Sequence, residues 1–335
     1  MKTAPKTVTL HDVARVAGVS LITASRALSN PGVVSRATIE KVQEAVARVG
    51  YIPNLLAGGL KSRRSMTVAG LVPIISVPQF LPTVQALTET LDEHGYQLIL
   101  GQSGYDHHRE EQLITTMMGR RPDGVVFTGL VHSTRAREQL RALGVPVVET
   151  WDLSERPVDM AVGFSHLKVG SAVAGYFLSR GWQRLAIATG DDHRAQVRRE
   201  GFLAAVGRDV PTAVVPAPSN LALGRRALSE ILLQDPQIEA IYCSSDGLAQ
   251  GVMVEAQARG LRIPQDLAVC GFGDADFAAH LCPSLTTVHV DGAQIGRLAA
   301  QLILDRCNGK PIPHSVIDLG FRVVERESTG GPGRT

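Results

Sequence analysis

Cysteine is scarce in this sequence, and the few cysteines show no pattern of metal ligands. The four, Cys243, Cys270, Cys282 and Cys307, form no Cys-x-x-Cys pair and have no histidine at the spacing of a zinc ligand. We therefore expect neither a zinc site nor a disulfide framework. Reduced thiols fit a bacterial-type cytoplasm better.

Long apolar runs and the motifs of common catalytic sites are also missing. The longest mostly apolar stretch, residues 66–77, contains Pro73 and is too short to span a bilayer, and no apolar segment follows the basic start. There is no Gly-x-Ser-x-Gly elbow, no Gly-x-x-x-x-Gly-Lys-Ser/Thr loop and no His-Glu-x-x-His helix. The pair His107-His108, followed by Glu110-Glu111, more often forms the solvated face of a polar helix than a metal site. We expect a cytoplasmic protein that is not an enzyme, binds no metal or cofactor and does not contact a membrane.

Positive charge gathers at one end of the chain. Up to Arg64 there are ten Lys and Arg against three Asp and Glu, whereas the remainder has 24 against 29. A basic head on a mildly acidic body indicates that the head alone contacts a polyanion. With 335 residues the chain also exceeds one compact core, so we expect several domains.

The basic head has the pattern of a helix-turn-helix. Apolar spacing predicts helices over residues 10–17, 21–28 and 36–49, with turns at Gly18 and at Asn30-Pro-Gly32. The expected N-caps are Thr9, Ser20 and Ser35. In a helix-turn-helix the second helix enters the DNA major groove, so the sequence predicts DNA binding.

From residue 66 onward, short apolar strands alternate with amphipathic helices. This alternation predicts parallel sheets covered by helices on both faces. Strands are expected at residues 68–72, 97–100, 124–128, 145–148, 185–189, 214–215, 240–243 and 267–272. Helices are expected at residues 81–94, 108–120, 135–143, 167–180, 197–206, 221–233 and 248–259. Two similar sets, before and after about Gly163, predict two doubly wound lobes with a ligand cleft at the carboxyl ends of the strands.

Together these patterns resemble the lactose/galactose-repressor family of bacterial transcription regulators over essentially the whole chain. The match rests on Thr9-Leu-x-Asp-Val-Ala-x-x-Ala-Gly-Val-Ser20 with Tyr51-x-Pro-Asn54, and in the lobes on Gly70-Leu-Val-Pro73 and Pro283-x-Leu-Thr-Thr287. The stretch from Pro146 to Asp152 is most similar to repressors of gluconate-type operons. The resemblance implies an all-α helix-turn-helix DNA-binding domain followed by an α/β periplasmic-binding-protein-like core of two doubly wound lobes. We accordingly expect a DNA-binding domain (1–53), a hinge helix and linker (54–65), an effector-binding and dimerisation core (66–328) and a disordered tail (329–335).

The resemblance also places the DNA contacts. Leu21, Ile22 and Arg26 are expected to face the groove, Arg26 as a donor to guanine or phosphate and the aliphatic pair against thymine methyls. Incidental surface exposure of the two aliphatics is the alternative. The other residues of the helical domain expected at the DNA interface, as phosphate contacts or helix caps, are Thr9, Ser20, Thr23, Ser25, Asn30, Ser35 and Tyr51.

Residues 54 to about 61 resemble the family's hinge helix, which forms on operator DNA and inserts a leucine into the minor groove. Leu60 matches that leucine, and Asn54, Ala57 and Lys61 are expected to contact DNA beside it. Gly58-Gly59 disfavours a helix here, and a flexible linker is the alternative. The family pattern implies a homodimer on pseudo-palindromic double-stranded operator DNA, released when an effector binds.

The expected effector site lies between the lobes. Arg198 matches the family's effector-contacting arginine, and its planar fork suits a carboxylate or phosphate. Glu149 and the aspartates would accept hydrogen bonds from sugar hydroxyls, which together with Arg198 describes gluconate, a ketogluconate or a phosphorylated gluconate. The full expected set is Ser76, Gln79, Phe80, Thr128, His132, Glu149, Trp151, Arg198, Ser245, Asp246 and Asp274.

Structural roles compete with several of these assignments. Arg198 could belong to a solvated helix face, Trp151 could be core, and Asp246 could cap the helix that it begins. Gly273 stands where the family has an aspartate, so Asp274 can replace it only if the loop shifts. A periplasmic-type sugar-binding protein without a regulatory role is the alternative function, and the basic head argues against it.

Overall fold

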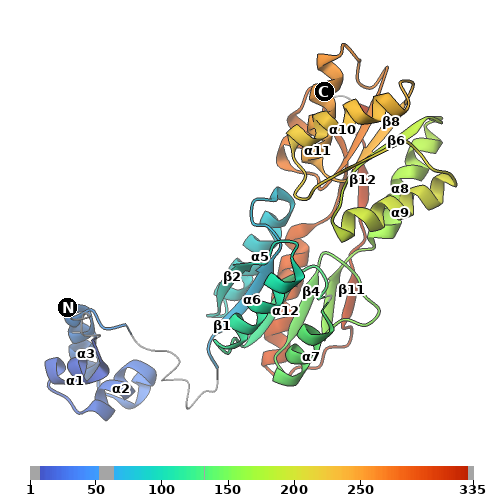
Figure 1. The fold of residues 1–335 in the computed structure, drawn as a ribbon. Coiled ribbons are helices and arrows are strands. Elements are labelled where there is room, and N and C mark those ends of the chain that lie inside the picture. Colours follow the sequence, from blue (N-terminus) through green and yellow to red (C-terminus); the bar gives the residue numbers. More distant parts are fainter. Residues whose placement is uncertain (1–7, 53–63, 132, 331–335) are drawn as a thin grey trace, which may run out of the picture. The chain divides into compact units, whose positions relative to one another are not determined.

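The computed structural model describes residues 8–52, 64–131 and 133–330. The chain forms two compact units, Met1–Ser65 and Met66–Thr335 (Figure 1). The first is all-α and the second is α/β with two doubly wound lobes, which confirms the predicted fold class. None of the helices in the described ranges has the length and apolar character that a membrane crossing requires.

The first unit is a small helical domain whose local signals are all in the sequence. Its elements are α1 (Leu10–Ala17), α2 (Leu21–Ser29), η1 (Pro31–Val33) and α3 (Arg36–Val49). Gly18 ends α1 at φ 66°, a left-handed conformation that favours glycine, and so allows the tight turn into α2. Val13, Ala27, Val42 and Ala45 form the buried core between the three helices.

Each lobe of the second unit is built on a twisted sheet, which in the described residues has six strands. The first sheet has the order β11-β5-β4-β3-β1-β2 and the second the order β12-β10-β9-β8-β6-β7. All neighbouring strands are parallel except β10 and β12. The strands of the first sheet are β1 (Thr67–Val72), β2 (Gln97–Gln102), β3 (Gly124–Thr128), β4 (Val147–Thr150), β5 (Met160–Gly163) and β11 (Val316–Asp318). Those of the second are β6 (Leu185–Gly190), β7 (Thr212–Val215), β8 (Ala240–Cys243), β9 (Ala268–Phe272), β10 (Thr286–His289) and β12 (Arg322–Val324).

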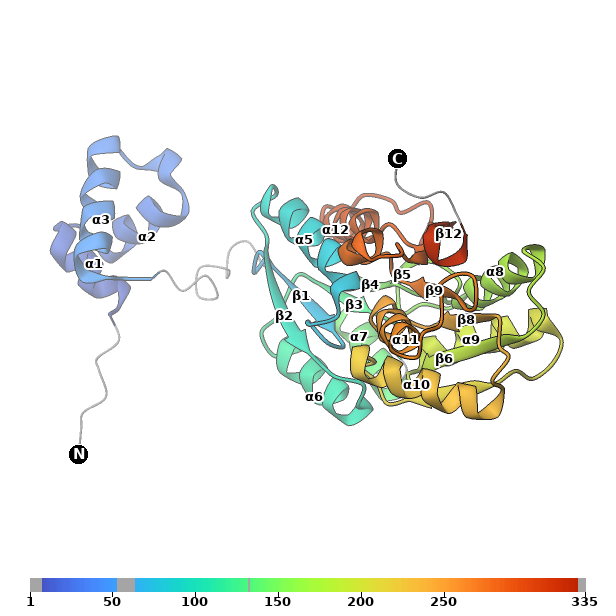
Figure 2. The same ribbon diagram turned by 90° about the horizontal axis from the view of Figure 1, so that it is seen from above.

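Helices cover both faces of each sheet (Figures 1 and 2). The first lobe contains η2 (Pro78–Phe80), α5 (Leu81–Asp92), α6 (His107–Met118), α7 (Thr134–Leu143) and α12 (Gly292–Cys307). The second contains α8 (His166–Ser179), α9 (His193–Val206), α10 (Leu221–Gln234), α11 (Asp246–Ala258), η3 (Asp276–His280) and η4 (Glu327–Thr329). The apolar side chains of the sheets are buried under these helices, as the predicted strand–helix alternation requires.

The division into lobes differs from the single break near Gly163 that the sequence predicted. The chain passes between the lobes three times, after β5, after β10 and before β12. Helix α12 returns to the first lobe, where it packs on α5 (Figure 1, orange and cyan). Strands β5, β10, β11 and β12 were not predicted. Each has only three or four residues, a length at which a pattern is ambiguous even though two other strands of four residues, β4 and β8, were found. Helix α12 was not predicted either, and apolar spacing along a helix would not tell which lobe it joins.

The disordered tail was predicted to begin at residue 329, and this boundary is too early. Thr329 is buried in η4, and its hydroxyl hydrogen-bonds Tyr176 at 2.8 Å. Arg180 donates to the carbonyls of Thr329 and Gly330. These two residues belong to the second lobe, because long-range polar contacts that a composition argument does not detect hold them there.

Candidate functional site

The outer face of α2 carries the residues that the sequence predicted to face DNA. Its inner face is fixed by Ala24 and Ala27, which are buried toward α1 and α3. On the other side Ile22 is 64% and Leu21 36% exposed. Ser25 and Arg26 are exposed as well. Helix α2 therefore presents two aliphatic side chains and a guanidinium together to solvent.

Other members of the expected DNA-binding set have local roles at helix ends. The backbone N–H and the hydroxyl of Thr9 both donate to Asp12, at 3.0 and 2.8 Å. Ser20 accepts a hydrogen bond from the backbone of Thr23 at 3.1 Å. Ser35 occupies the N-cap position of α3, but its side chain makes no capping hydrogen bond to the backbone and its hydroxyl lies 2.9 Å from that of Thr38. Asn30 ends α2, and Tyr51 packs half-buried against the helical core. The contacts of Thr9 and Ser20 explain where α1 and α2 begin, and the phosphate contacts of all these residues stay a prediction. The remaining expected contacts lie outside the described residues: Asn54, Ala57, Leu60 and Lys61.

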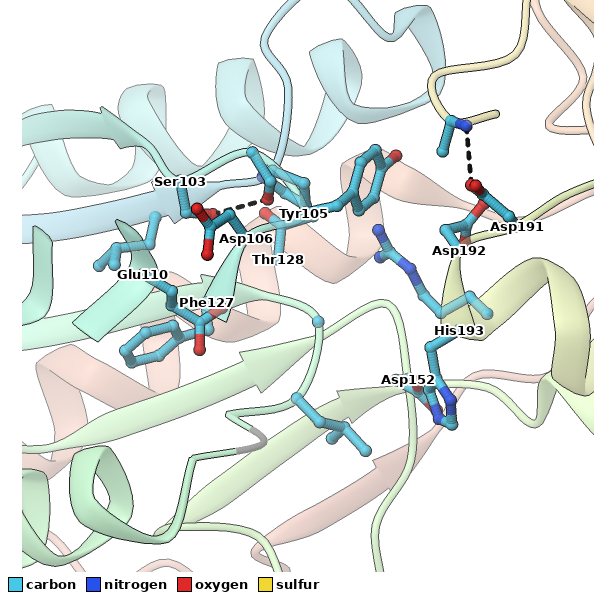
Figure 3. A pocket seen from close by; sticks show the side chains of 17 residues that line it. Ser103, Tyr105, Asp106, Glu110, Phe127, Thr128, Asp152, Asp191, Asp192 and His193 are labelled. Carbon is cyan, nitrogen blue, oxygen red and sulfur yellow. Dashed lines mark hydrogen bonds between the residues drawn. The ribbon is translucent and has the colours of Figure 1, made fainter. Parts of the chain in front are cut away.

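Two cavities meet between the lobes of the second unit. Cavity 1 has a volume of about 440 Å³ and cavity 2 about 360 Å³, and both are lined by Tyr105, Asp192 and Arg194. Their walls come from the carboxyl ends of parallel strands, where such sheets bind ligands. Figure 3 shows cavity 1 with Tyr105 and Asp106, which follow β2, on one side and Asp191–His193, which follow β6, on the other.

Arg198 is the most unusual residue of cavity 2. Its side chain is 4% exposed, one guanidinium nitrogen donates to the Ser244 carbonyl at 3.0 Å, and another lies 2.9 Å from Nδ1 of His166. The guanidinium also lies over the Phe272 ring, 4.1 Å from its centroid. In the described part of the chain Nε has no hydrogen-bond partner, and no carboxylate forms an ion pair with Arg198. A buried charge without a counter-ion is costly, so this wall favours an anion.

Close packing of α8 on α9 sets the distance between His166 and Arg198. A β-carbon on Gly170 would lie 1.8 Å from the carbonyl oxygen of Arg198, and one on Gly201 would lie 2.0 Å from that of Leu167. Glycine at these two positions is what lets the helix backbones touch. His166 is buried, and burial together with Arg198 holds its pKa well below the usual value.

Aromatic side chains form another wall of cavity 2. Trp151 lines the cavity, and its ring meets that of Phe80 edge-on with 5.1 Å between the centroids. Phe80 lies behind Trp151, and Arg194 covers its ring at 5.2 Å from the centroid. Trp151 is thus both core and cavity wall, so the two predicted roles are compatible.

Asp246 lines cavity 2, but it does not cap α11. The cap is Ser245, which accepts a hydrogen bond from the Leu248 backbone at 3.3 Å. Asp246 accepts hydrogen bonds from the Thr287 hydroxyl at 2.6 Å and from the Ala275 backbone at 2.7 Å. Burial raises the pKa of Asp246 to about 6.

This raised pKa predicts the pH dependence of stability. Folded Asp246 holds its proton up to about pH 6, whereas the unfolded residue loses it near pH 3.8. Its favourable contribution is therefore complete below pH 3.8 and falls by about 3 kcal/mol as the pH rises through 6. We expect the free energy of unfolding of the wild type, minus that of Asp246→Asn, to decrease between pH 4.5 and 7.5 in urea titrations.

Asp266 provides the control for this experiment. Its exposed carboxyl has a pKa lowered to about 2 by the hydrogen bond from Arg262, so it is ionised throughout that range in both states. The free energy of unfolding of the wild type, minus that of Asp266→Asn, should therefore be independent of pH. A flat profile for Asp246→Asn as well would contradict the assignment.

Cavity 1 is predominantly acidic. Five carboxylates line it against His193 and Arg194: Asp106, Glu110, Asp152, Asp191 and Asp192. Burial raises the pKa of Asp152, and Asp191 accepts a hydrogen bond from the Ala217 backbone at 2.8 Å (Figure 3). Within the described ranges no group of three or more His, Cys, Asp or Glu side chains is placed to hold a metal ion. These carboxylates can instead accept hydrogen bonds from hydroxyl groups.

The structure brings most of the expected effector residues together. Those that line cavity 2 are Ser76, Gln79, Trp151, Arg198, Ser245 and Asp246. Thr128 lines cavity 1, and His132 lies outside the described residues. Sequence reasoning missed Tyr105, Asp152, Asp192, Arg194 and His166. Tyr105, Asp152 and Asp192 lie two or three residues after the ends of β2, β4 and β6, so a search of the residues after each predicted strand would have pointed to them. His166 follows β5, which was not predicted, and Arg194 lies within α9.

Glu149 and Asp274 lie apart from both cavities. Glu149 is fully buried and accepts hydrogen bonds from the backbones of Val131 and Val158, both at 2.7 Å. The prediction that Glu149 contacts ligand hydroxyl groups is wrong in this structure, because its carboxylate is occupied by hydrogen bonds to the backbones of two loops. Asp274 pairs with Arg326 at 2.7 Å and with His289 at 2.8 Å, so the loop shift needed for a ligand contact is not seen.

Known proteins of similar sequence and structure are bacterial regulators. Residues 9–54 match the family model "Bacterial regulatory proteins, lacI family", and residues 174–329 match a periplasmic binding protein-like domain. The HTH-type transcriptional regulator GntR of Pseudomonas aeruginosa is 37% identical over 330 residues, which cover 96% of this chain and 95% of that protein.

Solved structures agree with these matches. A LacI-family transcriptional regulator from Silicibacter pomeroyi has a TM-score of 0.90 and 32% identity, with 96% of this chain and 99% of that chain covered. The transcription regulator GntR of Chromobacterium violaceum has a TM-score of 0.76 and 35% identity, with 79% of this chain and all of that chain covered.

Proposed function

The chain belongs to the LacI family of bacterial regulatory proteins, and from this premise we propose that it represses genes for the breakdown of gluconate-type sugar acids. It is a DNA-binding transcriptional regulator. In the proposal, a homodimer binds a pseudo-palindromic operator in the cytoplasm through the outer faces of α2, with Leu21, Ile22 and Arg26 toward the bases. A sugar acid bound between the lobes then releases it.

The proposed ligand class rests on the surroundings of Arg198. A buried guanidinium that stacks on Phe272 and lacks a carboxylate partner offers its free N–H groups to an anion. Arg194 lines the same cavity. A neutral sugar has no group that compensates this charge, whereas the carboxylate of a sugar acid does.

The acidic lining of cavity 1 favours an acid with a single charge. With the carboxylate at Arg198, the hydroxyl chain extends past Arg194 toward Asp152, Asp192 and Thr128. Hydroxyl groups donate to those carboxylates, while a terminal phosphate would be repelled by them. Gluconate or a ketogluconate therefore fits better than a phosphorylated gluconate.

Release follows if the ligand binds two arrangements of the lobes unequally. The cavities have walls from both lobes, so a bound ligand favours the arrangement in which both walls contact it. The shift in population can be no larger than the ratio of its affinities for the two arrangements. In the dimer such a change would alter the spacing of the two DNA-binding units.

Thermal-shift measurements on the full chain test the ligand class. Gluconate and ketogluconates are expected to raise the melting temperature by several degrees at about a hundred times their Kd, corresponding to about 2.7 kcal/mol. Phosphorylated gluconate should raise it less, and glucose, the control without a carboxylate, hardly at all. A larger shift with glucose than with any acid would remove Arg198 from its proposed role.

A gel shift with DNA from the gene's own promoter separates this function from the alternative. A periplasmic-type sugar-binding protein would leave the DNA unshifted at every salt concentration. A regulator that contacts several phosphates should bind, and should lose affinity steeply between 50 and 200 mM salt. Addition of gluconate should then reverse the shift.

A further inference from the structure

A continuous line of buried hydrogen bonds runs from Arg198 in the second lobe to Gly292 in the first. Arg198 lies 2.9 Å from Nδ1 of His166, and Nε2 of His166 lies 2.9 Å from the carbonyl oxygen of Trp151. The Trp151 indole donates to the Thr83 hydroxyl at 2.9 Å, and Thr83 donates to the Gly292 carbonyl at 2.8 Å. All four side chains are at most 4% exposed. We call this line the Arg198–Gly292 relay.

Chemistry fixes the direction of every bond in the relay. A guanidinium can only donate, so Nδ1 of His166 accepts, and a carbonyl can only accept, so Nε2 carries the hydrogen. His166 is therefore a neutral imidazole in one tautomer. Because the indole also only donates, Thr83 must use its single hydrogen on Gly292. No member can reverse its bond without leaving a buried polar atom unpaired.

The relay joins the ligand wall to the helices of the first lobe. Arg198 is on α9, and His166 is the first residue of α8, directly after the chain enters the second lobe. Thr83 is on α5, and Gly292 begins α12, where the chain has just returned to the first lobe. β1, the strand that directly follows the DNA-binding unit in the chain, belongs to this lobe as well.

Trp151 is the member of the relay whose backbone is held in an unfavourable conformation. It has φ 63°, a left-handed backbone conformation that residues with a β-carbon rarely adopt. The bonds of its carbonyl to His166 and of its indole to Thr83 hold it there. On the His166 side, Gly170 and Gly201 allow the backbones of α8 and α9 to lie in direct contact, with no side chain between them at these positions. The contacts of His166 with Arg198 and with the Trp151 carbonyl provide a path by which a movement of Arg198 toward an anion would reach Trp151.

We propose that the Arg198–Gly292 relay transmits occupancy of Arg198 to the α5–α12 pair, and that Thr83 and His166 are positioning residues for release from DNA. The inference rests on the proposed function. Thr83 contacts neither cavity, so it acts only through Trp151. Cutting the relay at Thr83 should leave a protein that binds both ligands but no longer couples them.

The test compares Thr83→Val with Thr83→Ser and Thr88→Val in the full-length dimer. Valine keeps the shape of Thr83 but removes its hydroxyl, while serine keeps the hydroxyl. Thr88 is on the same helix, where its hydroxyl bonds only the Val84 carbonyl in an exposed turn, so Thr88→Val is the matched control. Two quantities are measured: the gluconate Kd of the DNA-free protein, and the ratio of operator Kd with and without saturating gluconate.

Thr83→Val should keep its gluconate Kd within about threefold while the operator ratio falls at least fivefold toward one. Thr83→Ser and Thr88→Val should keep the wild-type ratio. His166→Asn, which retains an acceptor for Arg198 but is too short to reach the Trp151 carbonyl, should also lower the ratio. Melting curves identify any variant that is unfolded. If Thr83→Val is unfolded, His166→Asn decides the question through both quantities, because His166 also lines cavity 2: a loss of coupling larger than the loss of gluconate affinity supports the relay, and equal losses contradict it.

The outcomes separate the relay from the function on which it rests. If the wild type leaves operator DNA on gluconate addition and both relay variants do so equally well, the relay is wrong and the function stands. The relay is also wrong if Thr83→Val loses gluconate affinity and coupling in equal proportion, because that indicates a structural role. If the wild type itself does not respond to any sugar acid, both proposals fall.

Discussion

Replacing Arg26 by alanine is expected to weaken operator binding of the dimer by about 30-fold or more. Arg26 is exposed on the outer face of α2, and each copy lost from a half-site costs about 1–3 kcal/mol if it contacts a base edge. Two copies give about 2–6 kcal/mol per dimer. Because the side chain is not part of the helical core, the melting temperature and gluconate binding should stay unchanged. Gel shifts at fixed salt measure the effect.

Arg48→Ala is the matched control for Arg26→Ala. Arg48 is also exposed, but it lies in the last turn of α3, so its loss removes the same charge from another helix. If general attraction to phosphate were the main contribution, both variants would weaken binding alike, and this would contradict base recognition by Arg26. Measurements on operators with single base changes refine the result, since a base contact relaxes preference at one position and a phosphate contact lowers affinity for all sequences.

The helices of the first unit could be predicted because their signals are local. Thr9 and Ser20 begin α1 and α2, and Gly18 ends α1, each by an interaction within a few residues. The return of α12 to the first lobe could not be predicted, because it depends on packing against α5, about 200 residues earlier in the chain. The same holds for Thr329, whose partners Tyr176 and Thr286 are distant in sequence.

Within the candidate ligand site, Arg198 lines a cavity between the lobes as the sequence predicted, whereas Glu149 lies outside both cavities. Parallel strands are buried on both faces, so the alternation along β4 does not tell which face Glu149 occupies. Its face is decided by the backbone N–H groups of Val131 and Val158, which require a buried acceptor. His166 was missed for a related reason. Its importance comes from Arg198 and Trp151, its partners in space, rather than from a motif around it.

The second large effect is expected for Arg198→Gln, which should weaken gluconate binding at least 100-fold and abolish release from DNA. Two charge-assisted hydrogen bonds to a carboxylate contribute about 1.5–3 kcal/mol each, so losing both costs about 3–6 kcal/mol. The DNA-binding unit is untouched, so the variant should still bind operator as tightly as the wild type. Calorimetry with gluconate and gel shifts with saturating gluconate measure the two results.

Arg199→Gln is the control for this prediction, since Arg199 is the neighbouring arginine, contacts Gln196 and lines neither cavity. Full release of Arg198→Gln by gluconate would contradict the assignment. Arg198→Lys then separates charge from shape, because lysine keeps the charge but lacks the planar fork and the stacking on Phe272. If lysine restores most of the affinity, the site recognises charge alone and should accept other small anions. If Arg198→Lys binds gluconate as weakly as Arg198→Gln, the orientation of the guanidinium decides which acids bind. That orientation depends on His166 and the Ser244 carbonyl.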